Sequence, residues 1–180
     1  MVGNLPNLLT LTRILLLPFF VATLIYNQYR YALIIFIAAS VTDILDGFIA
    51  RITKQITDFG KILDPVADKF FLVTSFILMS NIGLIPKWLA IIVISKDLIV
   101  VTGSVILYFV THKLNFEPSM LGKAASASQF FLVGLILLYM NLTEAMPVPV
   151  PIFNIVAVVT SLAGFHYVYK GLKIANSENS

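Results

Sequence analysis

The chain has 180 residues, of which 59% are hydrophobic and only 12% are charged, whereas about a quarter of the residues are charged in an ordinary soluble domain. This composition excludes a typical water-soluble protein and predicts a membrane protein. The sequence contains no cysteine, which excludes disulfides, thiolate nucleophiles and thiolate metal sites. The net charge of +3 comes from basic residues spread along an apolar chain. We interpret them as determinants of membrane topology and of contact with anionic lipid, not as a nucleic-acid surface.

Six apolar segments follow one another along the sequence, and each approaches the length of about 20 residues that a helix needs to cross a bilayer. They are residues 6–27, 31–51, 61–82, 85–111, 118–141 and 150–170. Because the bilayer offers no water to the backbone, each segment is expected to be an α-helix. The predicted fold class is all-α: a polytopic membrane protein with six transmembrane helices in a single domain over residues 1–180. The first segment carries Arg13 and Pro18 and follows no basic region, so we expect it to be retained and not cleaved as a signal peptide.

Lysine and arginine are unevenly distributed between the two sides of this predicted arrangement. The richer side holds Arg51, Lys54, Lys61, Lys113, Lys123, Lys170 and Lys173. The other side holds only Arg30 and Lys87. Since basic residues favour the cytoplasmic side, both termini are predicted to be cytoplasmic, as are the connections between helices two and three and between helices four and five.

Five of the six aspartates lie between positions 43 and 68. Asp43 and Asp46 are near the end of the second segment, and Asp64 and Asp68, four residues apart, are near the start of the third. The connection between these segments is short, so the helices are expected to be antiparallel neighbours that bring the two pairs together. Asp64 is a candidate N-cap of the third helix, and Asp58 is expected to be a solvated loop charge.

Four carboxylates at one depth of a membrane need positive charge beside them, because desolvating each one costs several kcal/mol. Oxygen ligands without histidine or cysteine favour Mg²⁺, Mn²⁺ or Ca²⁺. Four of them could hold two ions about 3.5–4 Å apart, an arrangement suited to displacement at phosphorus. The small residues Gly47, Ala50 and Gly60 would leave the backbone open to a nucleotide or pyrophosphate, or would serve helix packing alone.

The pattern D-x-x-D-G-x-x-A-R-x8-G-x-x-x-D-x-x-x-D is complete between positions 43 and 68. It resembles the signature of the CDP-alcohol phosphatidyltransferase family. The resemblance implies transfer of a phosphatidyl group from CDP-diacylglycerol to an alcohol with release of CMP, by a homodimer of six-helix subunits that uses two Mg²⁺ or Mn²⁺ ions. It implies metal ligation by Asp43, Asp46, Asp64 and Asp68, with Asp68 also acting as the base. The implied contacts to CDP-diacylglycerol are Gly47, Ala50, Arg51, Gly60, Asn7 and Thr10.

The alcohol acceptor is the more difficult question. The start of the chain, with Asn7, Thr10 and Arg13 at helical spacing, resembles two branches of the family: members that use glycerol 3-phosphate, and cardiolipin synthases, which use phosphatidylglycerol. We favour glycerol 3-phosphate, with Lys96, Lys123 and Arg13 as its binding residues.

Each of these basic residues also has a structural interpretation. Arg13 could snorkel toward the membrane interface. Lys96 could pair with Asp97, although adjacent helical positions diverge by about 100°. Lys69 and His166 are interpreted as structural residues.

Other classes explain the sequence less completely. Intramembrane prenyltransferases also bind pyrophosphate through aspartates and Mg²⁺. Their pattern is two separated acidic motifs on a larger number of spans, whereas this chain has one motif and six predicted spans. A cation channel or transporter would account for intramembrane aspartates but not for Arg51 and the glycines at these spacings. The resemblance and the topology together predict a bacterial inner (plasma) membrane protein whose active site faces the cytoplasm.

Overall fold

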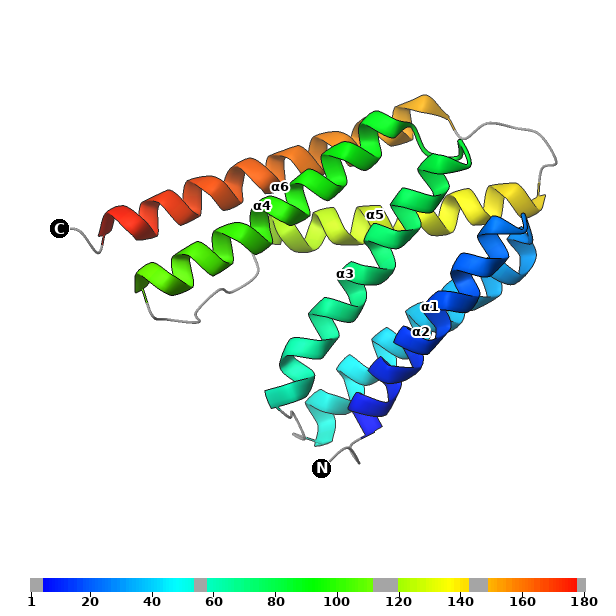
Figure 1. The fold of residues 1–180 in the computed structure, drawn as a ribbon, viewed down its shortest axis with the longest axis horizontal. Helices are drawn as coiled ribbons and strands as arrows, with labels where there is room; N and C mark the ends of the chain where they lie inside the picture. Colours follow the sequence, from blue (N-terminus) through cyan, green and yellow to red (C-terminus); the bar gives the residue numbers. More distant parts are fainter. Residues whose placement is uncertain (1–4, 54–57, 112–119, 143–148, 178–180) are drawn as a thin grey trace. The chain divides into compact units, whose positions relative to one another are not determined.

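A computed structural model describes residues 5–53, 58–111, 120–142 and 149–177, with side chains described for 11–43, 45, 69–103, 120–142 and 149–172. The described residues form helices and no strand (Figure 1). The helices are α1 (Leu5–Ile25), α2 (Tyr29–Thr53), α3 (Asp58–Asn81), α4 (Lys87–Thr111), α5 (Met120–Leu142) and α6 (Val150–Ser177). All six predicted segments are therefore helical, and the all-α fold class is confirmed.

Most helix ends lie within two residues of the predicted ones, and two differ by more. Helix α3 begins at Asp58 and not near residue 61, so Asp64 lies inside the helix and is not its N-cap. Asp58 is the first residue of the helix and not a loop residue, a position where an acidic side chain is favoured by the helix dipole. Helix α6 continues to Ser177, past the predicted end at residue 170. Apolar content predicted the stretch that could lie in lipid, whereas these helices extend into polar sequence.

One compact unit comprises residues 1–84 and 133–147, and so contains α1, α2, α3 and the second half of α5. Its centre is a cluster of three rings from three helices, Phe20, Phe36 and Phe71, with centroids 4.9–6.4 Å apart. Gly134 of α5 lies against Phe36, where an added Cβ would come within 3.0 Å of the ring carbon Cε1. In this unit α1 and α3 run in one direction and α2 runs in the opposite direction (Figure 1).

Two turns of this unit are described, one after α1 and one after α3. Asn27 adopts φ 55° between α1 and α2, a left-handed conformation that asparagine tolerates in turns. Tyr29 Oη donates a hydrogen bond of 2.8 Å to Asn27 Oδ1. At the end of α3, Gly83 adopts φ 83° while the Leu84 amide donates to the Met79 carbonyl at 2.8 Å, which is a Schellman-type helix end. The first of these turns lets α2 run antiparallel to α1.

The second compact unit comprises residues 85–132 and 148–180, and so contains α4, the first half of α5, and α6. Helices α4 and α6 lie side by side and run in the same direction (Figure 1). Gly164 of α6 faces Lys96 of α4, and Gly103 of α4 faces Tyr167 of α6. The buried side chain of Gln129 on α5 donates a hydrogen bond of 3.1 Å from Nε2 to Thr160 Oγ1 on α6.

Besides those in the core, many large apolar side chains point outward from the helices. Leu15, Phe70, Ile91, Phe131 and Phe165 are between 61% and 75% exposed. Two of the helical stretches, Met120–Leu142 and Val150–Leu172, are long and apolar enough to cross a membrane. An exterior of this kind is stable against hydrocarbon and unfavourable in water.

Candidate active site

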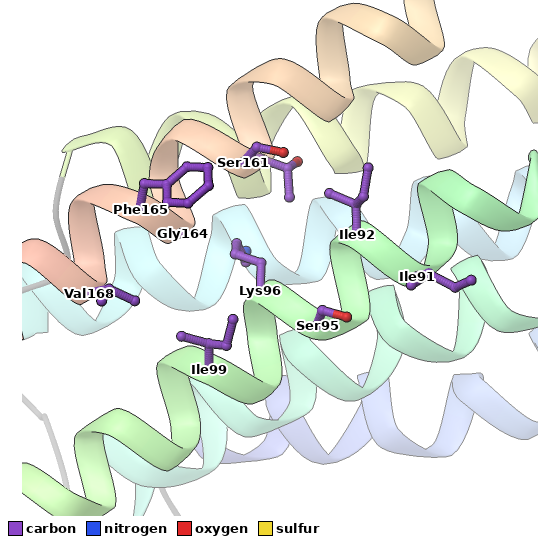
Figure 2. A pocket seen from close by; sticks show the side chains of 10 residues that line it. Ile91, Ile92, Ser95, Lys96, Ile99, Ser161, Gly164, Phe165 and Val168 are labelled. Carbon is purple, nitrogen blue, oxygen red and sulfur yellow. The ribbon is translucent and has the colours of Figure 1, made fainter.

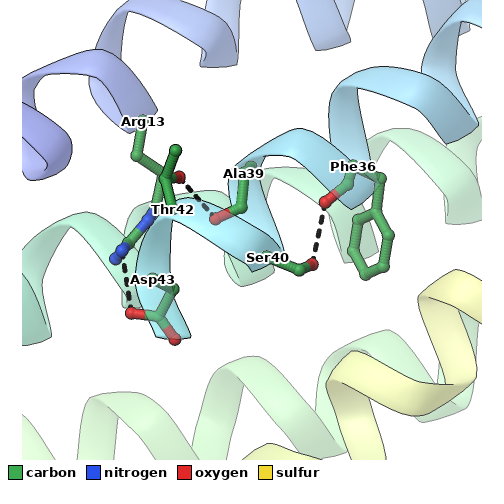
Figure 3. A network of polar contacts seen from close by, with 6 residues as sticks. All are labelled: Arg13, Phe36, Ala39, Ser40, Thr42 and Asp43. Carbon is green, nitrogen blue, oxygen red and sulfur yellow. Dashed lines mark hydrogen bonds and ion pairs between the residues drawn. The ribbon is translucent and has the colours of Figure 1, made fainter. Parts of the chain in front are cut away.

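The first aspartate of the signature, Asp43, is bonded to a buried arginine (Figure 3). Arg13 Nη2 of α1 donates to Asp43 Oδ1 of α2 at 2.8 Å. The side chain of Arg13 is 1% exposed and that of Asp43 is 38% exposed. A buried guanidinium without a carboxylate beside it is strongly destabilising. The ion pair therefore holds Asp43 of α2 against Arg13 of α1. The sequence predicts Arg13 as an acceptor contact, and in the structure Arg13 is bonded to Asp43.

The hydroxyl groups on the preceding turn of α2 are occupied by their own helix. Ser40 Oγ donates to the Phe36 carbonyl and Thr42 Oγ1 donates to the Ala39 carbonyl, each at 2.8 Å (Figure 3). Such local bonds give the hydroxyl proton a partner within the helix, so no ligand is needed to accept it. The proton of each hydroxyl is therefore bonded within the helix, and the Asp43 carboxylate is the charged acceptor among the polar side chains that Figure 3 shows on α2.

The remaining signature residues are placed by the backbone only. Asp46, Gly47, Ala50 and Arg51 are in α2, and Gly60, Asp64 and Asp68 are in α3, as helical residues whose side chains lie outside the described part. Asn7 and Thr10 are in α1, and their side chains also lie outside the described part. Among the described side chains no group of three potential metal ligands occurs, since only Asp43 of the predicted set is among them.

The contact between Phe36 and Phe71 fixes the register of α2 against α3. Their ring centroids are 6.1 Å apart, although one residue is on α2 and the other on α3. Asp43 follows Phe36 by two helical turns, and Asp64 precedes Phe71 by two helical turns, a displacement of about 10 Å along each axis. Because the two helices run in opposite directions (Figure 1), the backbones of Asp43 and Asp64 are at corresponding levels.

A second buried charge pair lies on α4. Lys96 Nζ bonds to Asp97 Oδ1 at 2.7 Å, with side chains 5% and 7% exposed. Sequence analysis weighed this pairing and favoured a phosphate contact, because adjacent Cβ atoms diverge around a helix. The lysine side chain is long enough to reach Asp97 despite this divergence. Its stem lies close to Gly164, where an added Cβ would be 3.3 Å from Lys96 Cγ.

A cavity of about 260 Å³ opens between α4 and α6 beside Lys96 (Figure 2). Its lining residues are Ile91, Ile92, Ser95, Lys96, Ile99, Thr160, Ser161, Gly164, Phe165 and Val168. Most of this lining is hydrocarbon, and the Lys96 ammonium is bonded to Asp97. As it stands, the cavity suits an apolar group better than a bare phosphate.

Lys123, the other predicted acceptor contact of the second unit, is exposed near the start of α5. No described contact joins it to Lys96.

Sequence analysis did not single out Gln129 and Thr160. Both are fully buried, and Thr160 is part of the cavity lining. Gln129 Oε1 has no hydrogen-bond partner among the described residues. The only signal in the sequence was a glutamine inside the apolar run of α5, where an amide is costly unless it is bonded.

The fold and the site together define an all-helical protein with an apolar exterior and a signature aspartate anchored between its first two helices. The chain belongs to the CDP-alcohol phosphatidyltransferase family, since residues 3–164 match the sequence profile of that family.

Full-length relatives are similar along most of the chain. It is 34% identical over 151 residues to the CDP-diacylglycerol–glycerol-3-phosphate 3-phosphatidyltransferase of Bacillus subtilis (strain 168), covering 76% of this chain and 77% of the relative. It is 30% identical over 179 residues to the protein of the same name in Aquifex aeolicus (strain VF5), covering 93% and 99%. The corresponding Haemophilus influenzae protein is 32% identical over 180 residues, covering 96% and 97%.

Proposed function

We infer that this chain is an enzyme of phospholipid biosynthesis that transfers the phosphatidyl group of CDP-diacylglycerol to glycerol 3-phosphate, forming phosphatidylglycerophosphate and releasing CMP. The observation that carries this conclusion is the complete signature on α2 and α3. The backbones of Asp43 and Asp64 lie at corresponding levels of these two antiparallel helices. Relatives named for this reaction, similar over nearly the whole chain, support glycerol 3-phosphate as the acceptor.

We further propose six membrane crossings with both termini in the cytoplasm of a bacterial cell. The alternating directions of α1, α2 and α3, and the common direction of α4 and α6, are those that a chain crossing a bilayer at every helix must adopt. The outward apolar side chains would face lipid. In this topology the side that carries the signature would also hold most of the basic residues of the sequence, so the site would face the cytoplasm of the inner membrane.

The donor set of the signature fits a divalent cation. Asp43, Asp46, Asp64 and Asp68 offer only carboxylate oxygens, which suit Mg²⁺ or Mn²⁺. Asp43 remains 38% exposed after bonding to Arg13, so one of its oxygens is left for a ligand. Two such ions, when bound, would neutralise the pyrophosphate and stabilise CMP as the leaving group.

The protein itself would orient the substrates and move one proton. Asp68 would accept the proton of the acceptor hydroxyl as the acceptor oxygen forms a bond to the phosphorus that carries the diacylglycerol. The bond between that phosphorus and CMP breaks in the same displacement. CDP-diacylglycerol would be bound by the set Gly47, Ala50, Arg51, Gly60, Asn7 and Thr10.

Lys96 and Lys123 are the residues we propose for the phosphate of glycerol 3-phosphate. Lys96 would exchange its bond to Asp97 for a bond to the phosphate, or share its ammonium between the two, since an ammonium has three donors. This role predicts that the Lys96–Asp97 pair loosens when the acceptor binds.

A second candidate acceptor is phosphatidylglycerol, which would make the chain a cardiolipin synthase. The apolar lining of the cavity beside Lys96 favours it, because a lipid acceptor would bring hydrocarbon to that position.

The test supplies purified protein with CDP-diacylglycerol and one acceptor at a time, and identifies the lipid product and the CMP released. Phosphatidylglycerophosphate formed from glycerol 3-phosphate is the expected result. Cardiolipin formed from phosphatidylglycerol, with no product from glycerol 3-phosphate, would select the second candidate. Cation flux through vesicles without CMP release would instead indicate a channel or transporter. We also propose a homodimer, which the molecular mass of the detergent-solubilised protein would test.

A further inference from the structure

Arg13 lies outside the signature, yet it is the most buried charged side chain of the first compact unit that the structure describes. Its Nη2 bonds to one oxygen of Asp43, and the Asp43 side chain is more than one third exposed. The two partners differ in exposure: the arginine is enclosed by the protein, and the aspartate is partly open to its surroundings. A carboxylate held in this way has its orientation set before any ligand arrives.

We propose that Arg13 is a positioning residue that holds Asp43 by Oδ1 so that Oδ2 is directed toward a divalent cation. This inference rests on the metal-binding role that the proposed function gives to Asp43. It assigns Arg13 to the support of the metal site and not to the acceptor, where sequence analysis had placed it.

Two physical effects favour this role. First, a hydrogen bond from a rigid, planar guanidinium restricts the rotation of a short aspartate side chain, which lowers the entropy that metal binding must remove. Second, four neighbouring carboxylates repel one another before a cation binds, and one buried positive charge reduces that repulsion. Partners of metal ligands that act in this way typically change metal affinity or activity by about 10–100-fold when they are removed.

Burial also argues against a direct role in acceptor binding. At 1% exposure, the guanidinium would have to leave Asp43 and move toward solvent to meet a water-soluble phosphate. That movement would leave Asp43 without the cation that neutralises it. The contact at 2.8 Å has the usual length of a charge-assisted hydrogen bond, about 2.7–2.9 Å.

The experiment compares Arg13→Gln and Arg13→Lys with the parent protein, purified in detergent and stripped of metal. Mn²⁺ binding is measured without substrates by the electron paramagnetic resonance signal of free Mn²⁺. Arg13→Gln should weaken Mn²⁺ binding by about 10–100-fold. Arg13→Lys should restore part of the loss, because an ammonium keeps the charge but not the planar geometry. Arg30→Gln, a change at an exposed arginine near the start of α2, is the matched control and should bind Mn²⁺ as the parent does.

A second measurement separates positioning from acceptor binding. At saturating Mn²⁺, the KM for glycerol 3-phosphate in Arg13→Gln should stay close to the parental value. Parental Mn²⁺ affinity in Arg13→Gln, with or without a raised acceptor KM, would overturn the inference. If Arg13→Gln does not fold, Arg13→Lys decides in the same way: weakened Mn²⁺ binding supports positioning, and parental affinity rejects it. Absence of Mn²⁺ binding by the parent protein would instead reject the metal site of the proposed function itself.

Discussion

Lys96 and Asp97 are consecutive residues of one helix and are nevertheless bonded to each other, Nζ to Oδ1 at 2.7 Å, with both side chains buried. The pair is neutral as a whole, which is how a helix in an apolar setting can carry two ionised groups. Each residue therefore depends on the other, and a substitution at one position tests two things at once: the stability of the pair and the function of the single residue.

Substitution of Lys96 by methionine should destabilise the protein strongly. Removing one partner of a buried ion pair typically costs about 3–5 kcal/mol, because the remaining charge is left in an apolar environment. Adding Asp97→Leu should recover most of that loss, since an apolar pair needs no compensation. Thermal unfolding in detergent measures both effects, with Lys87→Met, at an exposed lysine at the start of α4, as the control.

The same double variant isolates the proposed acceptor role. Once Lys96→Met/Asp97→Leu is folded, the loss of a charge-assisted contact worth about 1.5–3 kcal/mol should raise the KM for glycerol 3-phosphate by about 10- to 100-fold. Metal binding should not change. A parental acceptor KM in this folded variant would remove Lys96 from the acceptor site and leave the ion pair as a purely structural feature.

Chelation should abolish phosphatidyl transfer. The signature places four aspartates close together in the sequence, and carboxylate oxygens bind hard divalent ions. Excess chelator should stop CMP release, and Mg²⁺ or Mn²⁺ should restore it. Full turnover in excess chelator would contradict the two-metal interpretation.

The sequence was sufficient to predict six helices because six apolar segments of about 20 residues, separated by polar or turn residues, follow one another along it. It misplaced the ends of α3 and α6 because Asp58 and the stretch up to Ser177 are polar. Apolar content marks where a chain can meet lipid, and a helix can continue beyond that point when its backbone bonds are satisfied internally. Helix start and stop signals, such as an acidic residue in the first turn, carry that additional information.

The site was predictable in its chemistry and less so in its contacts. The spacing of the aspartates is a local pattern, and it identified the family. The bond between Arg13 and Asp43 joins residues that are distant in the sequence, so no local spacing encodes it. The bond between Lys96 and Asp97 was weighed and disfavoured from backbone geometry alone. The length of the lysine side chain decided that contact, and helical periodicity does not describe it.

Gly134→Ala should destabilise the first compact unit. A Cβ at Gly134 would approach Phe36 Cε1 to 3.0 Å, and Phe36 is itself packed against Phe20 and Phe71. The ring therefore has little room to move, and overpacking of this kind typically costs about 1–3 kcal/mol. Thermal unfolding of the purified protein measures the loss.

The matched control for this glycine is Gly103→Ala on α4. Its Cβ would meet Tyr167 Cε1 at 3.5 Å, an ordinary contact distance, and alanine is favoured over glycine in a helix by about 1 kcal/mol. This variant should unfold at or above the parental temperature. Equal destabilisation by both substitutions would mean that the aromatic cluster is looser than the packing around Phe36 indicates.

Asp68→Asn tests the proposed base. The amide is close to the carboxylate in size but cannot accept the proton of the acceptor hydroxyl, and a general base typically contributes about 10²–10⁴-fold to the rate. The variant should keep its helical content and its binding of CDP-diacylglycerol while losing transfer by that factor. Loss of one metal ligand could lower the rate too, so the reaction is measured at Mn²⁺ concentrations that saturate the variant. Asp58→Asn, at an aspartate outside the signature, should stay within a few fold of the parent. If Asp68→Asn at saturating Mn²⁺ also stays within a few fold, Asp68 is not the base, and the acceptor must lose its proton to another group.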